Sequence, residues 1–478
     1  MSRAVRGGIW TAGSRIVAQG SQFLIFLVAV RILSPAEFGL FALVTAWTMI
    51  AAQVSMAGWP EYVMQWTGGP ERPREVLTVS LLAGVAIAAL AYAASRLVPG
   101  LSPDGRTLVQ LLGLSIPFVS VGAVYAGILN WQDRLTTAAL TAGICDTLNM
   151  VVAVIALRNG YDVLSLAFGR IASALVWFVL GAMAVRMAPA LTLDGRSLAE
   201  MARFSVQIIV VRLMTTFRLY AATLVIGTLL GATEAGYFRA AQRLAAALTE
   251  IIGEPTRVLT WSLFRAERVA QDGGIDFRAR ANSFYAGLAT LSLPLFLVMA
   301  LLAEEIVAVV FGDGWDPVVR VLPVLAAAHA ILVVSSTSEA IMSLAGRVRI
   351  LPWITLVFAL VSVGLAFLAA PFGMVAIAWS QVCAAAIAFV VNAAVQHRYA
   401  GVRWGQIARR LGAVLPGLVA MWLADLGLTR LPPVAEMAPV ARILLLGCIL
   451  LLVFTVTVLA LDPRLRAQAR AALLRRRP

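Results

Sequence analysis

Residues 33–41 read LSPAEFGLF, and residues 230–238 read LGATEAGYF. The two stretches align without a gap, and the matched positions that carry the same residue include Glu37 with Glu234, Gly39 with Gly236 and Phe41 with Phe238. The same register places Arg15 over Arg212 and Gln53 over Glu250. A shared turn, glutamate, glycine and arginine favours an internal duplication over chance similarity between apolar segments.

Apolar runs surround both copies and continue along the whole chain. The 478 residues are 61% hydrophobic and 13% charged, with a mean hydropathy of +0.90, whereas a soluble domain has roughly a quarter charged residues. Each run is long enough to cross a hydrocarbon core of about 30 Å. We therefore expect an all-α integral membrane protein with about 14 transmembrane helices. The expected spans are residues 8–33, 38–58, 76–96, 107–129, 135–157, 163–187, 204–230, 234–264, 283–311, 318–345, 351–370, 373–397, 407–426 and 439–461.

Six expected helices separate the two copies of the repeat. Because six is even, both copies have the same orientation, and a pseudo-two-fold axis between them would run along the membrane normal. We predict an N-terminal six-helix lobe at residues 1–203 and a second six-helix lobe at residues 204–398. Residues 399–478 would add two C-terminal helices and a basic tail.

Arginines in the loops predict the orientation of the chain. They gather on alternate loops by about six to one, and arginine in short loops is retained in the cytoplasm. Both termini are therefore expected in the cytoplasm. The formal charge of +14 is scattered over these loops instead of forming one patch, so it predicts topology and no nucleic-acid partner.

Polar residues inside two spans define the candidate substrate site. Arg15, Gln19 and Gln22 follow spacings of four and three, which places them on one face of the first helix. The span 234–264 carries a polar stripe of the same kind, made of Arg239, Arg243, Glu250, Glu254 and Arg257. Ionisable residues in a membrane are costly and tend to face an aqueous cavity or a partner. The stripe therefore lines a cavity or consists of internal ion pairs.

In the span 204–230, Arg212 is the candidate substrate-binding residue. It matches Arg15 in the repeat, and Arg218, six residues further on, points in a different direction. Net positive charge in a cavity attracts anions, and arginine binds phosphate through two hydrogen bonds. Anionic, phosphate-bearing substrates are therefore favoured over organic cations.

Three carboxylates could couple transport to an ion: Asp146, Glu250 and Glu254. Asp146 could equally be a hydrogen-bonded packing residue, and His329 is a core histidine or a proton relay. Cys145, Cys383 and Cys448 lie in apolar runs without a CxxC or Cys/His cluster. No metal, cofactor or catalytic residue is expected.

Several segments together resemble the bacterial polysaccharide-transporter family, the Wzx-type lipid-linked oligosaccharide flippases of the MOP superfamily. In chain order they read GGIWTAGSRIVAQGSQFLIFLVAVRILSPAEFGLFAL (7–43), GTLLGATEAGYFRAAQRLA (227–245), VFGDGWDPVVRVLPVLAAA (310–328), LAGRVRILP (344–352) and PFGMVAIA (371–378). The resemblance covers the first twelve spans. It implies a two-lobed helical fold that moves an undecaprenyl-diphosphate-linked glycan across the bacterial inner membrane by alternating access.

The resemblance also assigns residues. It implies that Arg15, Arg212, Arg239 and Arg243 match the cationic central cavity of the family. One segment departs from the family pattern: after the second helix the family often has a small-residue turn and an apolar-Ile-Gln segment, whereas residues 57–66 read AGWPEYVMQW and keep only Gln65. The resemblance implies a lipid-linked oligosaccharide and membrane lipids as partners, and other polysaccharide-assembly membrane proteins as further candidates.

Three alternatives stay open. A drug or organic-cation exporter of the same superfamily would use the carboxylates instead of the arginines. A peptidoglycan lipid II flippase is compatible with fourteen helices. A membrane polysaccharide polymerase would be an enzyme that needs a sizeable outward-facing loop to hold its acceptor. The expected outward loops have about ten residues or fewer, in the range of ordinary short connections between helices. A transporter without enzymatic activity is therefore predicted.

Overall fold

A computed structural model describes residues 3–190, 192–269, 274–335, 351–463 and 466–467. Within them every regular element is a helix, which confirms the expected all-α class. The chain forms two compact units, Met1–Gly236 and Tyr237–Pro478. The first unit includes the helix that carries Arg212. The lobe limits expected at residues 203 and 398 stay predictions.

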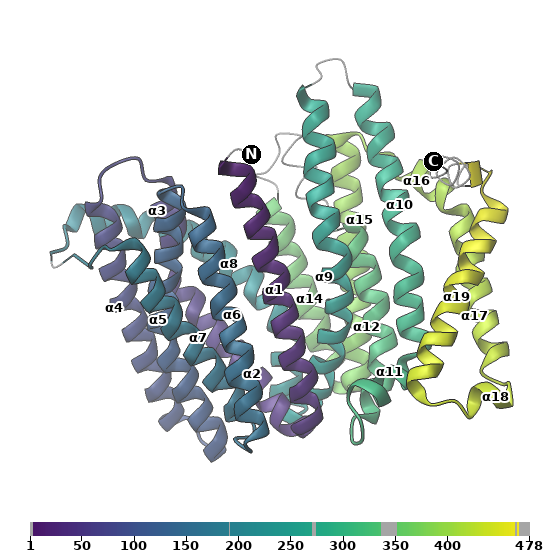
Figure 1. The fold of residues 1–478 in the computed structure, drawn as a ribbon, viewed down its shortest axis with the longest axis horizontal. Helices are drawn as coiled ribbons and strands as arrows, with labels where there is room; N and C mark the ends of the chain where they lie inside the picture. Colours follow the sequence, from purple (N-terminus) through teal and green to yellow (C-terminus); the bar gives the residue numbers. More distant parts are fainter. Residues whose placement is uncertain (1–2, 191, 270–273, 336–350, 464–465, 468–478) are drawn as a thin grey trace. The chain divides into compact units, whose positions relative to one another are not determined.

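Among the described residues, the first unit has eight helices and the first turn of a ninth. They are α1 (Arg3–Ile32), α2 (Pro35–Met56), α3 (Trp59–Gln65), α4 (Glu71–Leu97), α5 (Pro103–Trp131), α6 (Leu135–Arg158), α7 (Leu164–Val185), α8 (Gly195–Leu229) and the start of α9 (Ala232–Val269). In this unit α4 packs along α5, α1 along α6, and α7 along both α5 and α6. Figure 1 shows α4 and α5 side by side.

The second unit contains the rest of α9 and the helices that follow. They are α10 (Gly274–Leu301), α11 (Ala303–Val310), α12 (Asp316–Ser335), α14 (Leu351–Ala369), η2 (Ala370–Phe372), α15 (Met374–Ala400), α16 (Trp404–Arg410), η3 (Leu411–Ala413), α17 (Val414–Leu428), α18 (Pro432–Ala435) and α19 (Pro439–Leu461). α12 packs against α10 and α15, and α17 packs against α19. Figure 1 shows the short α18 at the connection between α17 and α19.

Thirteen helical segments of the described residues are long and apolar enough to cross a membrane. Each corresponds to one expected span, and the protein is a multi-pass membrane protein. The span expected at 234–264 is a helix, α9, but its charged stripe keeps it out of the thirteen. The count of fourteen therefore stays a prediction.

Some helices end where the sequence analysis did not place a limit. The span expected at 283–311 breaks at Leu302 into α10 and α11, and the span expected at 407–426 is divided among α16, η3 and α17. α8 begins nine residues before the expected 204, where the Asp194 side chain accepts from the Arg196 amide at 3.4 Å. Hydropathy cannot detect such limits, because a polar first turn or a single kink leaves the apolar run unchanged.

The repeated stretch at 33–41 forms a helix start. The Ser34 amide donates to Glu37 Oε2 at 2.8 Å, and the Ser34 hydroxyl accepts from the Glu37 amide at 3.3 Å. This reciprocal pair is a capping box, with Pro35 in the first turn of α2. Glu234 likewise lies in the first turn of α9. The matched glutamates therefore stabilise helix N-termini.

The matched glycines bring the two helix starts together. A Cβ at Gly39 would collide with the carbonyl of Ala232, and a Cβ at Gly236 would collide with the carbonyl of Pro35. Pro35 and Ala232 are themselves matched positions, so the contact is reciprocal. This is the pattern that a two-fold relation produces, and it explains why both copies need glycine. The symmetry of whole lobes stays a prediction.

Candidate functional site

The polar face of α1 lies on one uninterrupted helix, as expected. Arg15 and Gln22 are exposed, and Gln19 is half-buried. The Gln19 Oε1 atom is a buried acceptor with no hydrogen-bond partner among the described residues. This face combines a cation with two amide groups, a set that suits an anionic, hydroxyl-rich ligand.

Asp146 lies on α6, the helix that packs along α1. The side chain is half-buried. It has no hydrogen bond or ion pair within the described ranges, so the hydrogen-bonded packing role finds no support there. A role in ion coupling stays a prediction.

Arg212 forms an ion pair that the sequence did not suggest. Its Nη2 group donates to Glu61 Oε1 on α3. The two residues are 151 positions apart in the chain, and their side chains are 39% and 26% exposed. The only sequence signal was a charged residue between Trp59 and Trp66.

α3 is held firmly in the first unit. Gly58, with φ of 76°, begins it, and a Cβ there would lie 2.7 Å from the Cβ of Ile208 on α8. Ile208 is one helical turn before Arg212. This close approach is the reason that Glu61 reaches Arg212.

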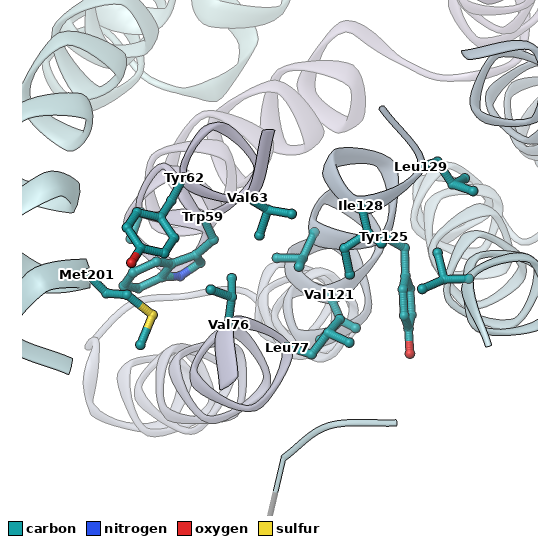
Figure 2. Packing of buried hydrophobic residues seen from close by; sticks show 13 residues of the cluster. Trp59, Tyr62, Val63, Val76, Leu77, Val121, Tyr125, Ile128, Leu129 and Met201 are labelled. Atoms are coloured by element: carbon teal, nitrogen blue, oxygen red, sulfur yellow. The ribbon is translucent and has the colours of Figure 1, made fainter. Parts of the chain in front are cut away.

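Buried side chains fix the other face of α3. Trp59, Tyr62 and Val63 belong to an apolar cluster with residues of α4, α5, α7 and α8. Figure 2 shows these three side chains packed with Val76 and Met201. The Trp59 Nε1 group donates to the Ser55 carbonyl at 3.0 Å. The helix that carries Glu61 is therefore anchored by its own core.

A second set of polar contacts lies on another side of the short helix α3. The Tyr62 hydroxyl donates to Glu200 Oε1 on α8 at 3.1 Å. Arg72 on α4 contacts Glu75 at 2.9 Å and Glu200 at 3.9 Å. The Arg72 guanidinium also lies 5.8 Å from the Trp66 ring centroid. These contacts connect α3, α4 and α8 on the side of Tyr62.

The stripe on α9 contains an internal ion pair. Arg243 Nη1 donates to Glu250 Oε1 at 3.1 Å, and Arg239 Nη1 donates to Gln242 Oε1 at 2.8 Å. For Arg243 and Glu250 the internal-pair alternative is therefore observed, although a paired arginine can still bind a ligand by exchange. The side chains of Glu254 and Arg257 lie outside the described residues.

His329 on α12 has a partner on α9. Its Nδ1 atom is 2.8 Å from the Thr249 hydroxyl, as expected for a core histidine. Within the described part of the chain, no group of three or more His, Cys, Asp or Glu side chains could hold a metal ion.

Arg170 is a membrane arginine that was not among the expected site residues. Arg170 lies on α7, and its guanidinium is 5.2 Å from the ring centroid of Phe41. Phe41 ends the repeated stretch at 33–41. The signal was present, because Arg170 is a lone charge in an otherwise apolar span. It was missed because no periodic neighbour marks it.

Two sequence comparisons give consistent matches. The profile of a family described as "Polysaccharide biosynthesis protein" matches residues 28–320. The succinoglycan biosynthesis transport protein ExoT of Rhizobium meliloti (strain 1021) is 25% identical over 362 residues, which cover 74% of this chain and 72% of that protein.

Solved structures show the same fold at low identity. Lipid II flippase MurJ in an inward closed conformation gives a TM-score of 0.74 at 14% identity, covering 94% of this chain and 98% of that one. An inward-facing multidrug resistance MATE family transporter of the MOP superfamily gives 0.63 at 17% identity, covering 80% and 95%. At these identities the likeness concerns the fold alone.

Proposed function

The chain belongs to the polysaccharide biosynthesis protein family, and from that premise we propose that it flips an undecaprenyl-diphosphate-linked oligosaccharide across the bacterial inner membrane. The cargo would be the repeat unit of an O-antigen, an exopolysaccharide or a capsule. The relatives are transporters and flippases, and this protein is a membrane transporter rather than an enzyme. The succinoglycan function of ExoT supports the choice of a polysaccharide precursor.

The observation that carries the proposal is the position of the arginines. The family match at 28–320 includes Arg212, Arg239 and Arg243, three cations on helices of a membrane protein. A diphosphate offers the paired oxygens that a guanidinium binds with two hydrogen bonds. Arg15, with Gln19 and Gln22 beside it, would add a cation and two amides that suit the diphosphate and the first sugars.

The membrane potential is a sufficient driving force for such a cargo. With both termini in the cytoplasm, as the loop arginines favour, an anion moves outward from a negative interior. Each charge gains about 2.3 kcal/mol per 100 mV, so two charges gain several kcal/mol. Coupling to an ion through Asp146, Glu250 or Glu254 would add to this drive.

Replacement of single arginines tests the proposal. Arg212→Ala and Arg243→Ala should each slow the flipping of a fluorescent undecaprenyl-diphosphate oligosaccharide in proteoliposomes by about 10- to 100-fold, the size of a lost hydrogen bond to a charged group. Arg158→Ala, at the exposed end of α6, is the matched control and should leave the rate unchanged.

The same assay separates the rivals. An organic-cation exporter would keep its export of cations in Arg212→Ala and Arg243→Ala. A lipid II flippase would transport lipid II in preference to the undecaprenyl-diphosphate oligosaccharide. Either result would overturn the proposal.

A further inference from the structure

The ion pair between Glu61 and Arg212 joins a rigid group to a flexible one. Glu61 stands on α3, whose buried Trp59, Tyr62 and Val63 fix it in the first unit. A Cβ at Gly127 of α5 would lie 2.8 Å from the Pro60 carbonyl, so α5 also presses on the backbone beside Glu61. Arg212 reaches this carboxylate from α8 through a long aliphatic stem. The backbone that carries Glu61 is therefore fixed by the fold, whereas Arg212 reaches the carboxylate through a longer and more flexible side chain.

The pair uses only part of the hydrogen-bonding capacity of both groups. Arg212 donates to Glu61 Oε1 alone, and Glu61 Oε2 is buried with no hydrogen-bond partner among the described residues. A guanidinium that meets a carboxylate or phosphate in the two-bond arrangement is held more strongly. A diphosphate offers that arrangement and more negative charge, so it can displace Glu61 from Arg212.

The two anions compete for one cation. A carboxylate presents its oxygens to a guanidinium as a phosphate does, so Glu61 has the chemistry of the ligand expected at Arg212. While Arg212 is bound to Glu61, the charge of each is compensated and neither pays the full cost of an unpaired charge in a membrane protein. When a diphosphate leaves, the fixed carboxylate is at hand to take the arginine back.

We infer that Glu61 is a built-in competitor of the substrate: its carboxylate holds Arg212 in the empty carrier, yields it to the diphosphate and recaptures it on release. This inference rests on the proposed function, in which Arg212 binds the diphosphate. Glu61 is then a positioning residue that weakens binding and speeds release. Its expected signature is opposite to that of a structural residue, because its loss tightens binding.

Glu61→Gln tests the inference with the least disturbance. Glutamine keeps the shape and the acceptor oxygen but removes the charge. Binding of undecaprenyl diphosphate to the full-length protein in nanodiscs should tighten about tenfold, the size expected when a half-buried, charge-assisted hydrogen bond no longer competes. In the flipping assay KM should fall and kcat should fall with it, because release becomes slower. Glu61→Asp, which keeps the charge, should stay close to wild type.

Glu200→Gln is the matched control. Glu200 also contacts α3, through the Tyr62 hydroxyl, but it does not contact Arg212 in the described structure. Its replacement should leave the affinity for undecaprenyl diphosphate unchanged. The melting temperature of each variant, measured beside binding, shows that the protein is folded.

The outcomes separate this inference from the proposed function. If Arg212→Ala weakens binding but Glu61→Gln leaves it unchanged or weakens it, Glu61 is only structural and the inference fails alone. If Arg212→Ala changes neither binding nor flipping, the proposed role of Arg212 fails, and the inference with it. In the double variant Glu61→Gln/Arg212→Ala the affinity should equal that of Arg212→Ala. The guanidinium for which Glu61 and the diphosphate compete is then absent.

Discussion

Two arginine–glutamate pairs of this protein differ in how they are built. Arg212 and Glu61 in the first unit come from α8 and α3 and are 151 positions apart in the chain. Arg243 and Glu250 in the second unit lie on one helix, α9, seven positions apart. The first pair exists only when two helices pack correctly, whereas the second exists wherever α9 is helical.

The difference has consequences for stability and for prediction. Helices of a membrane protein persist in its denatured state in a bilayer or detergent, so a pair within one helix can form there as well. A pair between helices is lost on unfolding. The pair on α9 should therefore contribute little to the free energy of unfolding, and the pair between α3 and α8 should contribute clearly.

Removal of the support of α3 should have the largest effect. Trp59 is 7% exposed, and Trp59→Ala is expected to lower the free energy of unfolding by about 3–5 kcal/mol through lost packing. Hydrogen exchange should show α3 losing protection while the described part of α9 keeps it. Trp315→Ala, at a buried site of the second unit, is the control and should leave the exchange of α3 unchanged. Equal loss of protection in α3 for both variants would contradict the claim that the buried side chains of α3 stabilise this helix locally.

The same contrast explains what could be predicted from the sequence. The spans were predictable because apolar runs record burial in lipid directly, and the polar faces of α1 and α9 because helical spacing alone places their residues together. The capping residues of the repeat, Ser34 and Glu37, were visible as a shared turn for the same local reason. The partner of Arg212 was not predictable, since it depends on the close approach of Gly58 to α8.

Two misses have the same physical origin. The break at Leu302 lies inside one apolar run, and hydropathy averages over it. Arg170 was overlooked because no polar residue at helical spacing marks it, and its neighbour Phe41 lies on another helix, α2. Tertiary contacts and local backbone geometry, not composition, determine both.

A double-mutant cycle on the pair between α3 and α8 should give the next largest effect. Glu61→Gln, Arg212→Gln and the double variant should show a coupling energy of about 1–2 kcal/mol in the free energy of unfolding, discounted for the partial exposure of both side chains. Chemical denaturation in mild detergent measures it. A coupling near zero would mean that the pair does not survive as a tertiary contact in the native state.

The hydroxyl of Tyr62 offers a smaller change in the same region. Tyr62→Phe removes the donor to Glu200 but keeps the buried ring, so the free energy of unfolding should fall by about 0.5–1 kcal/mol. The Glu200 side chain is 54% exposed and can bind water instead, which limits the loss. The affinity for undecaprenyl diphosphate should not change. A tightening like that expected for Glu61→Gln would show that any loosening of α3 releases Arg212.

The pair within α9 should give the smallest coupling, although its arginine is less exposed than Arg212, at 17% against 39%, and its glutamate only slightly more exposed than Glu61, at 32% against 26%. Arg243→Gln, Glu250→Gln and the double variant should show a coupling energy of about 0.3 kcal/mol, because the denatured state keeps α9 helical and with it the pair. Moving Glu250 out of register is the sharper form of the test. Glu250→Gln combined with Ile251→Glu leaves the net charge unchanged and turns the carboxylate about 100° around the helix. The free energy of unfolding of this variant should again change little. A coupling energy above about 1 kcal/mol in the double-mutant cycle would mean that Arg243 and Glu250 also hold α9 against another helix.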